Sequence, residues 1–443
     1  MTRVLRDPVR LIPLLFAGLI AVGTVVLMLP ISSAEGRFTD PVTALFHATS
    51  AVAVTGLVTV DTGTYWSAFG QGTILLLIQI GGLGIMTAAT LLGLMAGRGF
   101  SLRSKMATRV ERDRLNLSDT ASLLRLIFRI TLTVELTVAA ILALRFAIGW
   151  DMAPLTALWQ GVFHSVSAFN NAGFSTFSDS VMGFQGDALI LMPIALAVVI
   201  SALGFPVMED WREHRLDTRR WTLHSKMTLA GTALLLVGGF VATLATEWSN
   251  PDTLGPMPLA TKALNAFFHA VMPRTAGFNS LDVSAFRDET LVVNYVLMFI
   301  GGGSAGTAGG IKVTTFMVLA AIVLAEVLRR RDAGMFGRRF GHAVERQALT
   351  VAFIAMMLIV GATMYIMSVT GIRLADVLFE VISAFATVGL STGITASLPD
   401  TALLVLTVLM FVGRVGTITA ATALALGGSD RPYRYPEENP IVG

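Results

Sequence analysis

Long apolar stretches alternate with short polar segments along the whole chain. A bilayer core about 30 Å thick needs about 20 consecutive apolar residues per helix, and eight stretches reach or approach that length. They cover residues 11–30, 72–96, 130–148, 188–207, 227–246, 291–325, 348–369 and 403–426. This pattern predicts an all-α integral membrane protein with eight transmembrane helices. The first stretch follows Arg3, Arg6 and Arg10 and also suits a signal peptide, but it is longer than the usual core of ~7 to 15 residues.

The pore of such a protein is indicated by a segment that recurs four times, once between each pair of stretches. The copies begin at Phe46, Phe163, Phe267 and Phe379, and each places a glycine ten residues later, at Gly56, Gly173, Gly277 and Gly389. The third copy is irregular, because His269 lies one residue closer to its glycine than His47 and His164 do. The period predicts four repeats of helix, pore loop and helix, at residues 1–98, 99–212, 213–331 and 332–443, the last with a short C-terminal tail.

Each recurring segment is too short to span the bilayer, and after its glycine the chain runs back through a polar segment, which we call the polar return. Such re-entrant loops are tolerated at membrane depth only where protein buries them or where they line a water-filled cavity. Four of them therefore predict one central pore. Because glycine permits positive dihedrals and carries no Cβ, the loops favour a ring of backbone carbonyls that replaces the hydration shell of an ion.

The sixth stretch is broken by clustered glycines between Gly301 and Gly310. Each interior glycine costs a helix about 1 kcal/mol relative to alanine, so we expect an intramembrane loop on the cytoplasmic side of the pore loops. Close helix packing through small residues is the alternative. Lys312 follows this loop and either contacts it or extends toward the membrane surface.

Arg414 lies in the last stretch, where an arginine near the bilayer centre costs at least about 2.5 kcal/mol. Its spacing from Gly389 resembles that of the glycine loop from Gly277, so both are expected to meet below the pore loops. There Arg414 would bond loop carbonyls and repel cations. A static ion pair is the alternative.

Composition excludes several other classes of protein. Of 443 residues, 54% are hydrophobic and 14% are charged, whereas soluble chains carry roughly 25% charged residues. A soluble enzyme is therefore excluded, and the net charge of +3 is spread over separate clusters rather than one face that would suit nucleic acid. The absence of cysteine excludes disulfides, thiolate metal sites and cysteine nucleophiles.

Basic residues predict the orientation, because Lys and Arg in short loops stay on the cytoplasmic side. They are dense in segments 98–114, 212–226 and 329–346 and occur at both termini. The alternate loops hold Arg37, Lys262, Arg274, Arg287 and Arg373. Both termini are therefore expected in the cytoplasm. The basic loops act as this topology signal, and docking of a cytosolic partner on them stays open.

These residues resemble the Trk/Ktr/HKT superfamily of potassium transporters. The resemblance rests on TGL, AGF, AGF and VGL at the four loops, on RTAGFN at residues 274–279 and on GGGSAGTAGGIK at residues 301–312. It covers nearly the whole chain. Eight helices without an additional N-terminal pair look more like the Ktr-type membrane subunit than the longer Trk type. The resemblance implies filter carbonyls from Val54, Thr55, Gly56, Asn171, Ala172, Gly173, Thr275, Ala276, Gly277, Val388 and Gly389.

The resemblance also implies how the protein works. Glycine at all four filter positions implies a preference for potassium, since relatives that conduct mainly sodium carry serine at the first. The glycine loop and its neighbours would form a movable gate: Gly301, Gly302, Gly303, Ser304, Gly306, Gly309, Gly310, Lys312 and Arg414. We therefore expect potassium uptake across the bacterial inner membrane, driven by the membrane potential. Sodium as the main ion, and a sodium-coupled alternating-access transporter working as a symporter, are the alternatives.

By resemblance, such subunits pair as homodimers within the lipid bilayer and bind a cytosolic ring of RCK-type regulatory subunits that sense ATP, ADP or NADH. The chain itself is expected to bind no nucleotide and no nucleic acid. It is also expected to be no enzyme. The stretch Gly302–Gly306 matches the G-x-S-x-G pattern of hydrolases, but that pattern needs a preceding strand and a histidine within reach of the serine.

The remaining polar residues have two interpretations each. His47, His164 and His269, with Glu380 in the fourth repeat, suit pore-helix packing better than a zinc site. Asp61, Asp179, Asp282 and Asp400 follow the filters and either concentrate cations or are solvated loop carboxylates. Arg129, Glu135 and Arg145 are expected to reach the membrane surface or to pair with one another.

Overall fold

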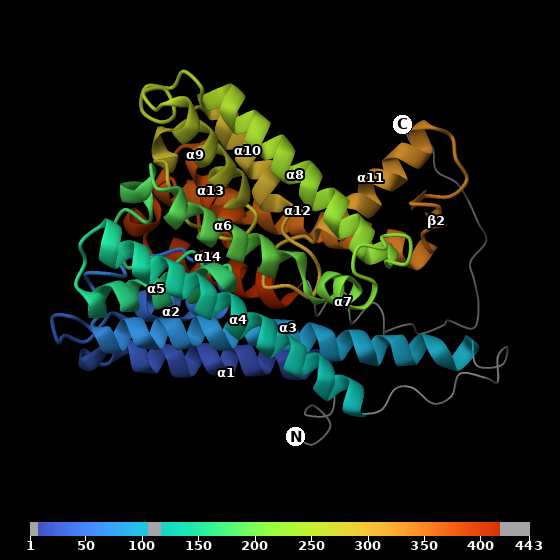
Figure 1. Cartoon of the computed structure of the whole chain (residues 1–443), viewed down its shortest axis with the longest axis horizontal. Helices are drawn as coiled ribbons and strands as arrows, with labels where there is room; N and C mark the ends of the chain where they lie inside the picture. The colour runs from blue at the N-terminus through green and yellow to red at the C-terminus, as the bar shows by residue number, and fades with distance from the viewer. Residues whose placement is uncertain (1–7, 105–116, 417–443) are drawn as a thin grey trace.

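The computed structural model describes residues 8–104 and 117–416, which form an assembly of long and short helices (Figure 1). The long helices are α1 (Pro8–Met28), α3 (Ala68–Ser104), α4 (Leu117–Gly149), α8 (Leu223–Glu247) and α12 (His342–Thr370). The helices of intermediate length are α6 (Ala188–Leu203), α7 (Phe205–His214), α10 (Asp288–Phe299), α11 (Val313–Val327) and α14 (Asp400–Phe411). The prediction of an all-α architecture is confirmed.

Four more helices of similar length lie between the others, each just before one of the recurring glycines. They are α2 (Pro41–Val52), α5 (Pro154–Phe169), α9 (Leu259–Val271) and α13 (Leu374–Phe385). With 12 to 16 residues each, they are about 18 to 24 Å long at 1.5 Å per residue. Their sharp starts are encoded locally: α2 and α5 each begin with a proline, and Asp40 caps α2 by accepting from the amides of Val42 and Thr43.

The remaining regular structure is minor. Single 3₁₀ turns occur at Pro30–Ser32, Met182–Phe184, Val283–Ala285 and Thr395–Ser397, and α14 continues into a π-helix at Val412–Gly416. A two-stranded antiparallel hairpin, β1 (Gly334–Met335) and β2 (Arg338–Arg339), lies between α11 and α12.

Each of the eight predicted stretches falls on a helix, but not all of them span the membrane unbroken. Within the described residues, four helices are long and apolar enough to cross by themselves, at Leu11–Met28, Leu124–Gly149, Leu223–Glu247 and His342–Thr370. The sixth stretch is divided between α10 and α11, as expected. The eighth was predicted to reach residue 426, and its last part lies outside the described residues.

The fourth stretch departs from the prediction. It was expected to be helical through residue 207, but α6 ends at Leu203 and α7 leaves at an angle of 88°. Gly204 makes this turn with a φ of +85°. A Cβ there would collide with the backbone oxygen of Ser304, so a glycine is required where the loop between α10 and α11 packs against the end of α6.

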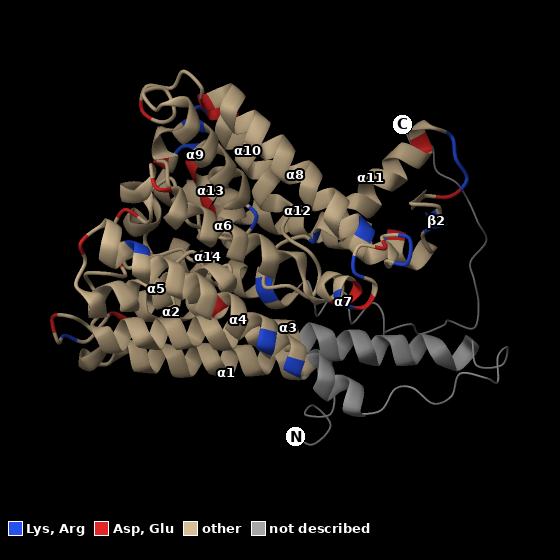
Figure 2. Cartoon of the chain, viewed as in Figure 1, with Lys and Arg blue, Asp and Glu red and all other residues tan. Residues whose placement is uncertain are grey.

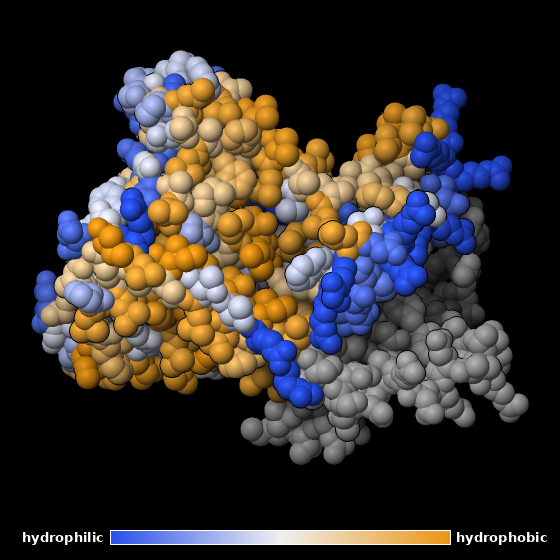
Figure 3. Space-filling model, in the orientation of Figure 1, coloured by the Kyte–Doolittle hydropathy of each residue, from blue (hydrophilic) through white to orange (hydrophobic). Residues whose placement is uncertain are grey.

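The surface is divided as expected for a membrane protein. Lys and Arg gather around α7 and β2 at one end of the molecule, whereas the opposite end carries many carboxylates (Figure 2). Figure 3 shows a largely apolar face between these two ends. Exposed leucines on α1 and α4, such as Leu15 at 62% and Leu144 at 61%, belong to helices that qualify as spans, which explains their exposure.

Candidate functional site

The short helices α2, α5, α9 and α13 all end in the same backbone turn. In each, the residue two positions before the recurring glycine and the glycine itself have a positive φ. The pairs are Val54 (56°) and Gly56 (92°), Asn171 (59°) and Gly173 (68°), Thr275 (75°) and Gly277 (75°), and Thr387 (50°) and Gly389 (94°). Left-handed residues at every second position turn successive peptide groups to the same side of the chain. The turn therefore suits a row of carbonyls that face one way.

The amides of these turns are bonded back to the short helices. The residue before each glycine donates its N–H to a helix carbonyl: Thr55 to Ser50 (2.7 Å), Ala172 to Ser167 (2.7 Å), Ala276 to Met272 (3.0 Å) and Val388 to Ser383 (2.8 Å). Gly56 and Gly389 donate theirs to the hydroxyls of Ser50 and Ser383, at 3.1 Å each. Because the donors are directed into the helices, the loop carbonyls are left for another partner.

The four glycines close into a ring. A Cβ added to any of them would strike the carbonyl oxygen of the residue that precedes the next glycine. The contacts run from Gly56 to Ala172, from Gly173 to Ala276 (2.7 Å), from Gly277 to Val388 (2.5 Å) and from Gly389 back to Thr55. The loops, far apart in sequence, thus meet in cyclic order, and we call these residues the glycine ring. Glycine is required at these positions by both its φ and its neighbours.

The short helices direct a negative potential at this ring. The C-terminal end of a helix carries about half a negative elementary charge from its unpaired carbonyls. The four helices end at Val52, Phe169, Val271 and Phe385, only a few residues before their glycines. Because four such ends converge, the site favours a cation over an anion.

Buried polar side chains connect three of the four short helices to the polar segments that follow them. His47 lies 3.4 Å from the carbonyl of Val60, and His164 lies 2.9 Å from the hydroxyl of Ser175. Glu380 accepts from Thr395 at 2.9 Å and also from Ser391. In each case the partner lies on the polar return that follows the glycine. These contacts agree with the packing interpretation of the histidines rather than with zinc.

The third repeat is one residue shorter at this point. Its fully buried phenylalanine is Phe268, whereas Phe267, the predicted equivalent of Phe46, is only partly buried. His269 bonds Asn294 of α10 at 3.0 Å instead of its own return segment. The missing residue lies before the turn, because Ala276 and Gly277 both donate to Met272. This shift explains the irregular spacing seen in the sequence.

A single non-helical segment, residues 300–312, lies between α10 and α11, and we call it the glycine loop. Its two ends pair with each other, with Gly301 N–H donating to Ile311 at 2.8 Å and Val313 N–H to Gly302 at 3.0 Å. Its middle is bonded to the end of α6, since Gly303 N–H donates to Ala202 at 2.7 Å. The predicted break in the sixth stretch is therefore present.

The glycine loop lies directly against the fourth turn of the glycine ring. A Cβ on Gly309 would strike the hydroxyl of Thr387 and lie 2.9 Å from the oxygen of Ala386, and one on Gly310 would lie 3.1 Å from the Ala386 Cβ. Thr307 donates from its hydroxyl to Phe169, the last residue of α5, at 3.4 Å. The loop thus contacts the base of two repeats, and its glycines are required for that approach.

Arg414 and the glycine loop meet as expected. Arg414 is 2% exposed, and its Nη1 donates to the carbonyl of Thr307 in the middle of the loop. Its Nε and Nη2 are buried and have no hydrogen-bond partner within the described residues. Lys312 donates from Nζ to Ala308 at 2.5 Å, which favours loop contact over extension to the surface. The static ion-pair alternative for Arg414 finds no support in these contacts.

Arg274 was assigned to an outer loop, and that assignment is wrong. The side chain is 3% exposed, and Arg274 directly precedes Thr275 in the third turn of the glycine ring. Its Nη2 is 3.4 Å from both the carbonyl of Gly301 and the hydroxyl of Thr232. Counting basic residues between apolar stretches cannot separate a loop from a re-entrant turn, which explains the error. Arg274 thus connects the third filter turn to the start of the glycine loop.

Two further residues of the site were missed or misread. Thr387 is the fourth left-handed residue and could have been found by counting two positions back from each glycine. Glu135 was expected to pair with an arginine or reach the surface, but it is 8% exposed and bonds the amides of Gln79 and Asn170 at 3.3 Å each. Arg145 pairs with Asp187 at 2.7 Å instead.

Three of the four aspartates that follow the recurring glycines have local roles. Asp61 accepts from the amide and hydroxyl of Thr64 at 2.7 and 2.9 Å. Asp282 accepts from the amide and hydroxyl of Ser284 at 2.9 and 2.7 Å. Asp400 lies in the first turn of α14, where a carboxylate suits the helix dipole.

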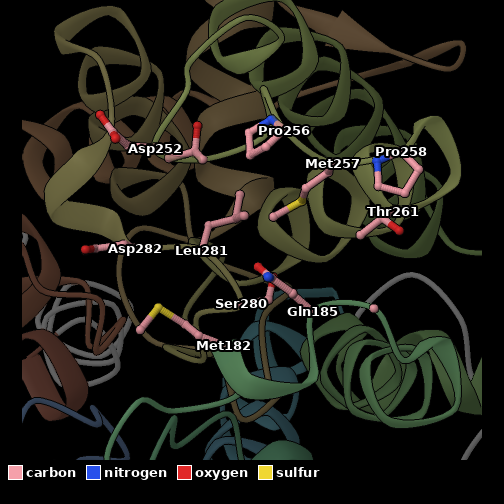
Figure 4. Close-up of a pocket in the computed structure, with 12 residues that line it drawn as sticks. Met182, Gln185, Asp252, Pro256, Met257, Pro258, Thr261, Ser280, Leu281 and Asp282 are labelled. Atoms are coloured by element: carbon pink, nitrogen blue, oxygen red, sulfur yellow. The ribbon is translucent and has the colours of Figure 1, made fainter.

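A pocket of about 580 Å³ lies beside Ser280–Asp282, in the polar segment that follows Gly277 (Figure 4). Figure 4 shows Met182, Met257 and Leu281 around it, with Gln185 and Ser280 beside them. Its wall is mixed apolar and polar, and the glycine ring and the glycine loop contribute nothing to it. We assign the pocket no role in the site.

Comparisons with known proteins show the family to which this fold is related. The family model TrkH, described as a cation transport protein, matches residues 15–432. The chain is 36% identical over 439 residues to the Ktr system potassium uptake protein B of Bacillus subtilis, covering 98% of this chain and 97% of the relative. It is 38% identical over 448 residues to the potassium/sodium uptake protein NtpJ of Enterococcus hirae, covering 99% and 97%.

The fold also matches a solved structure. The crystal structure of the potassium transporter TrkH from Vibrio parahaemolyticus aligns with a TM-score of 0.74 over 94% of this chain and 84% of that chain. At 20% sequence identity this match concerns the fold alone.

Proposed function

This chain belongs to the TrkH family of cation transport proteins, and from that premise we propose that it mediates potassium uptake through a pore whose filter is the glycine ring. Membership of the family confirms the resemblance drawn from the filter and loop motifs. It also makes the chain a transport protein rather than an enzyme. Potassium is proposed because relatives over nearly the full chain are named as potassium uptake proteins.

The observation that carries the proposal is the closed ring of four left-handed glycines. A ring of backbone carbonyls replaces the water around a dehydrated monovalent cation. Here the amides of Thr55 and Val388 are bonded to the short helices, so the oxygens of the turns are available to an ion. Four helix C-termini add negative potential without placing a carboxylate in the path. The filter residues are therefore the eleven deduced from sequence, with Thr387 added.

The gate is the glycine loop, with Arg414 as its latch. The loop packs against Ala386 and Thr387 at the base of the filter, where it blocks the path. Arg414 holds it through Thr307, and the positive charge of Arg414 and Lys312 repels a cation that leaves the filter. Opening requires the loop to leave this position, which breaks few backbone bonds.

The protein is proposed to act as part of an assembly in the bacterial inner membrane, with both termini in the cytoplasm. Relatives named as components of a Ktr system support a membrane subunit with other components. We infer a homodimer that binds a cytosolic nucleotide-sensing ring, with the basic end around α7 and β2 as the docking surface (Figure 2). Such a ring would act on the glycine loop, because Gly204, which leads into α7, lies against Ser304.

Sodium is the second candidate ion, since NtpJ is named a potassium/sodium uptake protein. Rubidium uptake separates the two. The purified chain is reconstituted into liposomes with an inside-negative potential, and ⁸⁶Rb⁺ entry is measured with external K⁺ or Na⁺ as competitor. We expect K⁺ to abolish uptake at concentrations where Na⁺ has little effect. Equal competition by Na⁺ would favour a sodium-conducting protein, and uptake that requires a Na⁺ gradient would favour coupled symport by alternating access.

A further inference from the structure

A carboxylate lies in the membrane behind the second filter turn and is part of neither the glycine ring nor the gate. Glu135 belongs to the span Leu124–Gly149 of α4, about 16 Å from one end and about 21 Å from the other at 1.5 Å per residue. It is 8% exposed. Ionisable residues at this depth are costly to insert and are retained where they serve a function.

Glu135 is one corner of a closed triangle of polar side chains. Gln79 of α3 donates from Nε2 to Glu135 Oε2 at 3.3 Å, and Asn170 donates from Nδ2 to Glu135 Oε1 at 3.3 Å. Asn170 also donates to Gln79 Oε1 at 2.7 Å. Each side chain therefore bonds the other two. Both donors are side-chain amides, and each oxygen of the Glu135 carboxyl group accepts from one of them.

The triangle holds the end of the second short helix. Asn170 is the C-cap of α5 and is fully buried. The next residue is Asn171, the left-handed filter residue whose side chain accepts from Ser201 at 2.9 Å. The helix is fixed to α4 a second time, because the Ser165 hydroxyl donates to the carbonyl of Glu135 at 2.6 Å. Displacing Asn170 would therefore displace the turn that follows it.

The equivalent position holds alanine in the first and fourth repeats, asparagine in the second and arginine in the third. Three residues before the glycine stand Ala53, Asn170, Arg274 and Ala386. Ala386 is small where the glycine loop packs, and Arg274 reaches that loop. Asn170 faces away from the loop, toward α3 and α4. The triangle is thus particular to the second filter turn and is not part of the fourfold pattern.

We propose that Glu135 is a specificity-determining positioning residue, which acts through Gln79 and Asn170 to fix the second filter turn. The inference rests on the proposed filter function. Gly56 and Gly173 both lie within van der Waals reach of neighbouring turns, so a shift of Ala172 changes the spacing on two sides of the ring. A ring that is wider or more adaptable discriminates less between ions of different radius.

The test measures how well Na⁺ competes with ⁸⁶Rb⁺ entry, relative to K⁺, in proteoliposomes that contain the full chain. The variants are Glu135→Ala, Glu135→Gln, Asn170→Ala and the double variant Glu135→Ala with Asn170→Ala. We expect Glu135→Ala to lower the K⁺ over Na⁺ preference at least about threefold, the low end of coupling between contacting residues. Glu135→Gln should lower it less, since its amide retains one acceptor. The double variant should resemble Glu135→Ala, because both substitutions break the same contact.

Thr137→Ala is the matched control, because Thr137 is exposed on the same helix and bonds only its own helix at Thr133. Thermal unfolding in detergent shows which variants fold. If Glu135→Ala does not fold, the ion preference of Glu135→Gln and Asn170→Ala tests the proposal instead. An unchanged ion preference in a folded variant, or additive effects in the double variant, overturns the proposal. Absence of K⁺-sensitive uptake in the unmodified chain would instead contradict the proposed function.

Discussion

The glycine ring and the glycine loop are both non-helical backbone buried among helices, but they are held in different ways. The ring consists of four copies of one turn, each bonded through its amides to a short helix and packed against the next copy. The glycine loop is a single segment that bonds α6 through the amide of Gly303, and the side chains of Arg274 and Arg414 bond its carbonyls at Gly301 and Thr307. The ring is thus held by four equivalent contacts, whereas the loop is held by a few contacts that differ from one another.

The two regions also differ in their electrostatic potential. Helix ends and carbonyls surround the ring, so a cation is favoured there. Arg414 and Lys312 accompany the loop, with Arg274 at its start. On the proposed function, a cation is held at the ring and repelled beside the loop. We therefore predict that ion selectivity, set by the ring, and pore closure, set by the loop, can be changed independently. Four substitutions test this prediction.

The largest effect is expected in the ring. Gly277→Ala would place a Cβ 2.5 Å from the oxygen of Val388 at a φ of +75°, so the ring must distort. We expect ⁸⁶Rb⁺ uptake to fall at least about tenfold, which corresponds to about 1.4 kcal/mol on the barrier. Gly238→Ala in α8 is the control, since nothing lies within 4 Å of its Cβ. Wild-type uptake by Gly277→Ala would contradict the ring as the conduction path.

The next largest effect is expected at the latch. Arg414→Ala removes the bond to Thr307 and a buried positive charge below the ring. Hydrogen bonds from charged groups contribute about 1.5–3 kcal/mol, so we expect uptake to rise several-fold with ion preference unchanged. Exposed Arg331 provides the control variant Arg331→Ala. Uptake at the wild-type rate, or a changed ion preference, would show that loop and ring are not separable in this way.

A smaller effect, on preference rather than rate, is expected from Gly56→Ser. The added side chain presses on the carbonyl of Ala172 at one corner of the ring. We expect Na⁺ to compete better with ⁸⁶Rb⁺ by a few-fold, about 1 kcal/mol in discrimination. Gly18→Ser, on α1 with open space around its Cβ, serves as the comparison. Unaltered competition would remove Gly56 from the filter.

The smallest effect on transport is expected from Asp187, which lies in neither region. Burial alone would raise the pKa of this carboxyl, but hydrogen bonds from Trp150 and Arg145, with the Arg145 charge, lower it below the ordinary value. A depressed folded-state pKa stabilises the protein above the unfolded pKa of about 3.9, and that stability is lost as pH falls through the folded pKa.

The Asp187 contribution is measured with Asp187→Asn. At neutral pH the variant should unfold at a lower temperature than the wild type, by about 1–2 kcal/mol in stability, and the difference should shrink below about pH 4. Uptake per folded molecule should not change. A difference that is independent of pH would mean that the Arg145 pair contributes no stability through its charge.

Much of the fold and of the site could be predicted from sequence. The positions of the helices follow from apolar length, and the turns follow from glycines spaced alike in four segments. The glycine loop follows from residues that a helix does not tolerate. Arg414 was placed at the loop by its offset from Gly389, and its contact with Thr307 agrees with that placement.

Other features could not be predicted, because they depend on which segments meet. From the sequence, Arg274 was assigned to an exposed loop. Its burial beside Gly301 is visible only in the structure. From the sequence, Glu135 was expected to reach the surface or to pair with a nearby arginine. Its actual partners, Gln79 and Asn170, lie 56 and 35 residues away in the sequence, so no local pattern indicates them. The end of α6 has a local signal, because Gly204 is followed by Pro206, but the contact of Gly204 with Ser304 depends on the tertiary structure.

The sequence by itself determined the class of protein, the fourfold repeat and the residues that cannot be replaced by larger ones, since hydrophobicity and glycine conformation are properties of the chain alone. Only the tertiary structure decided that the four turns close in cyclic order, that the glycine loop lies under the fourth of them, and that a carboxylate holds the second. Ring closure and buried polar contacts are relations between distant segments, and they are set by packing.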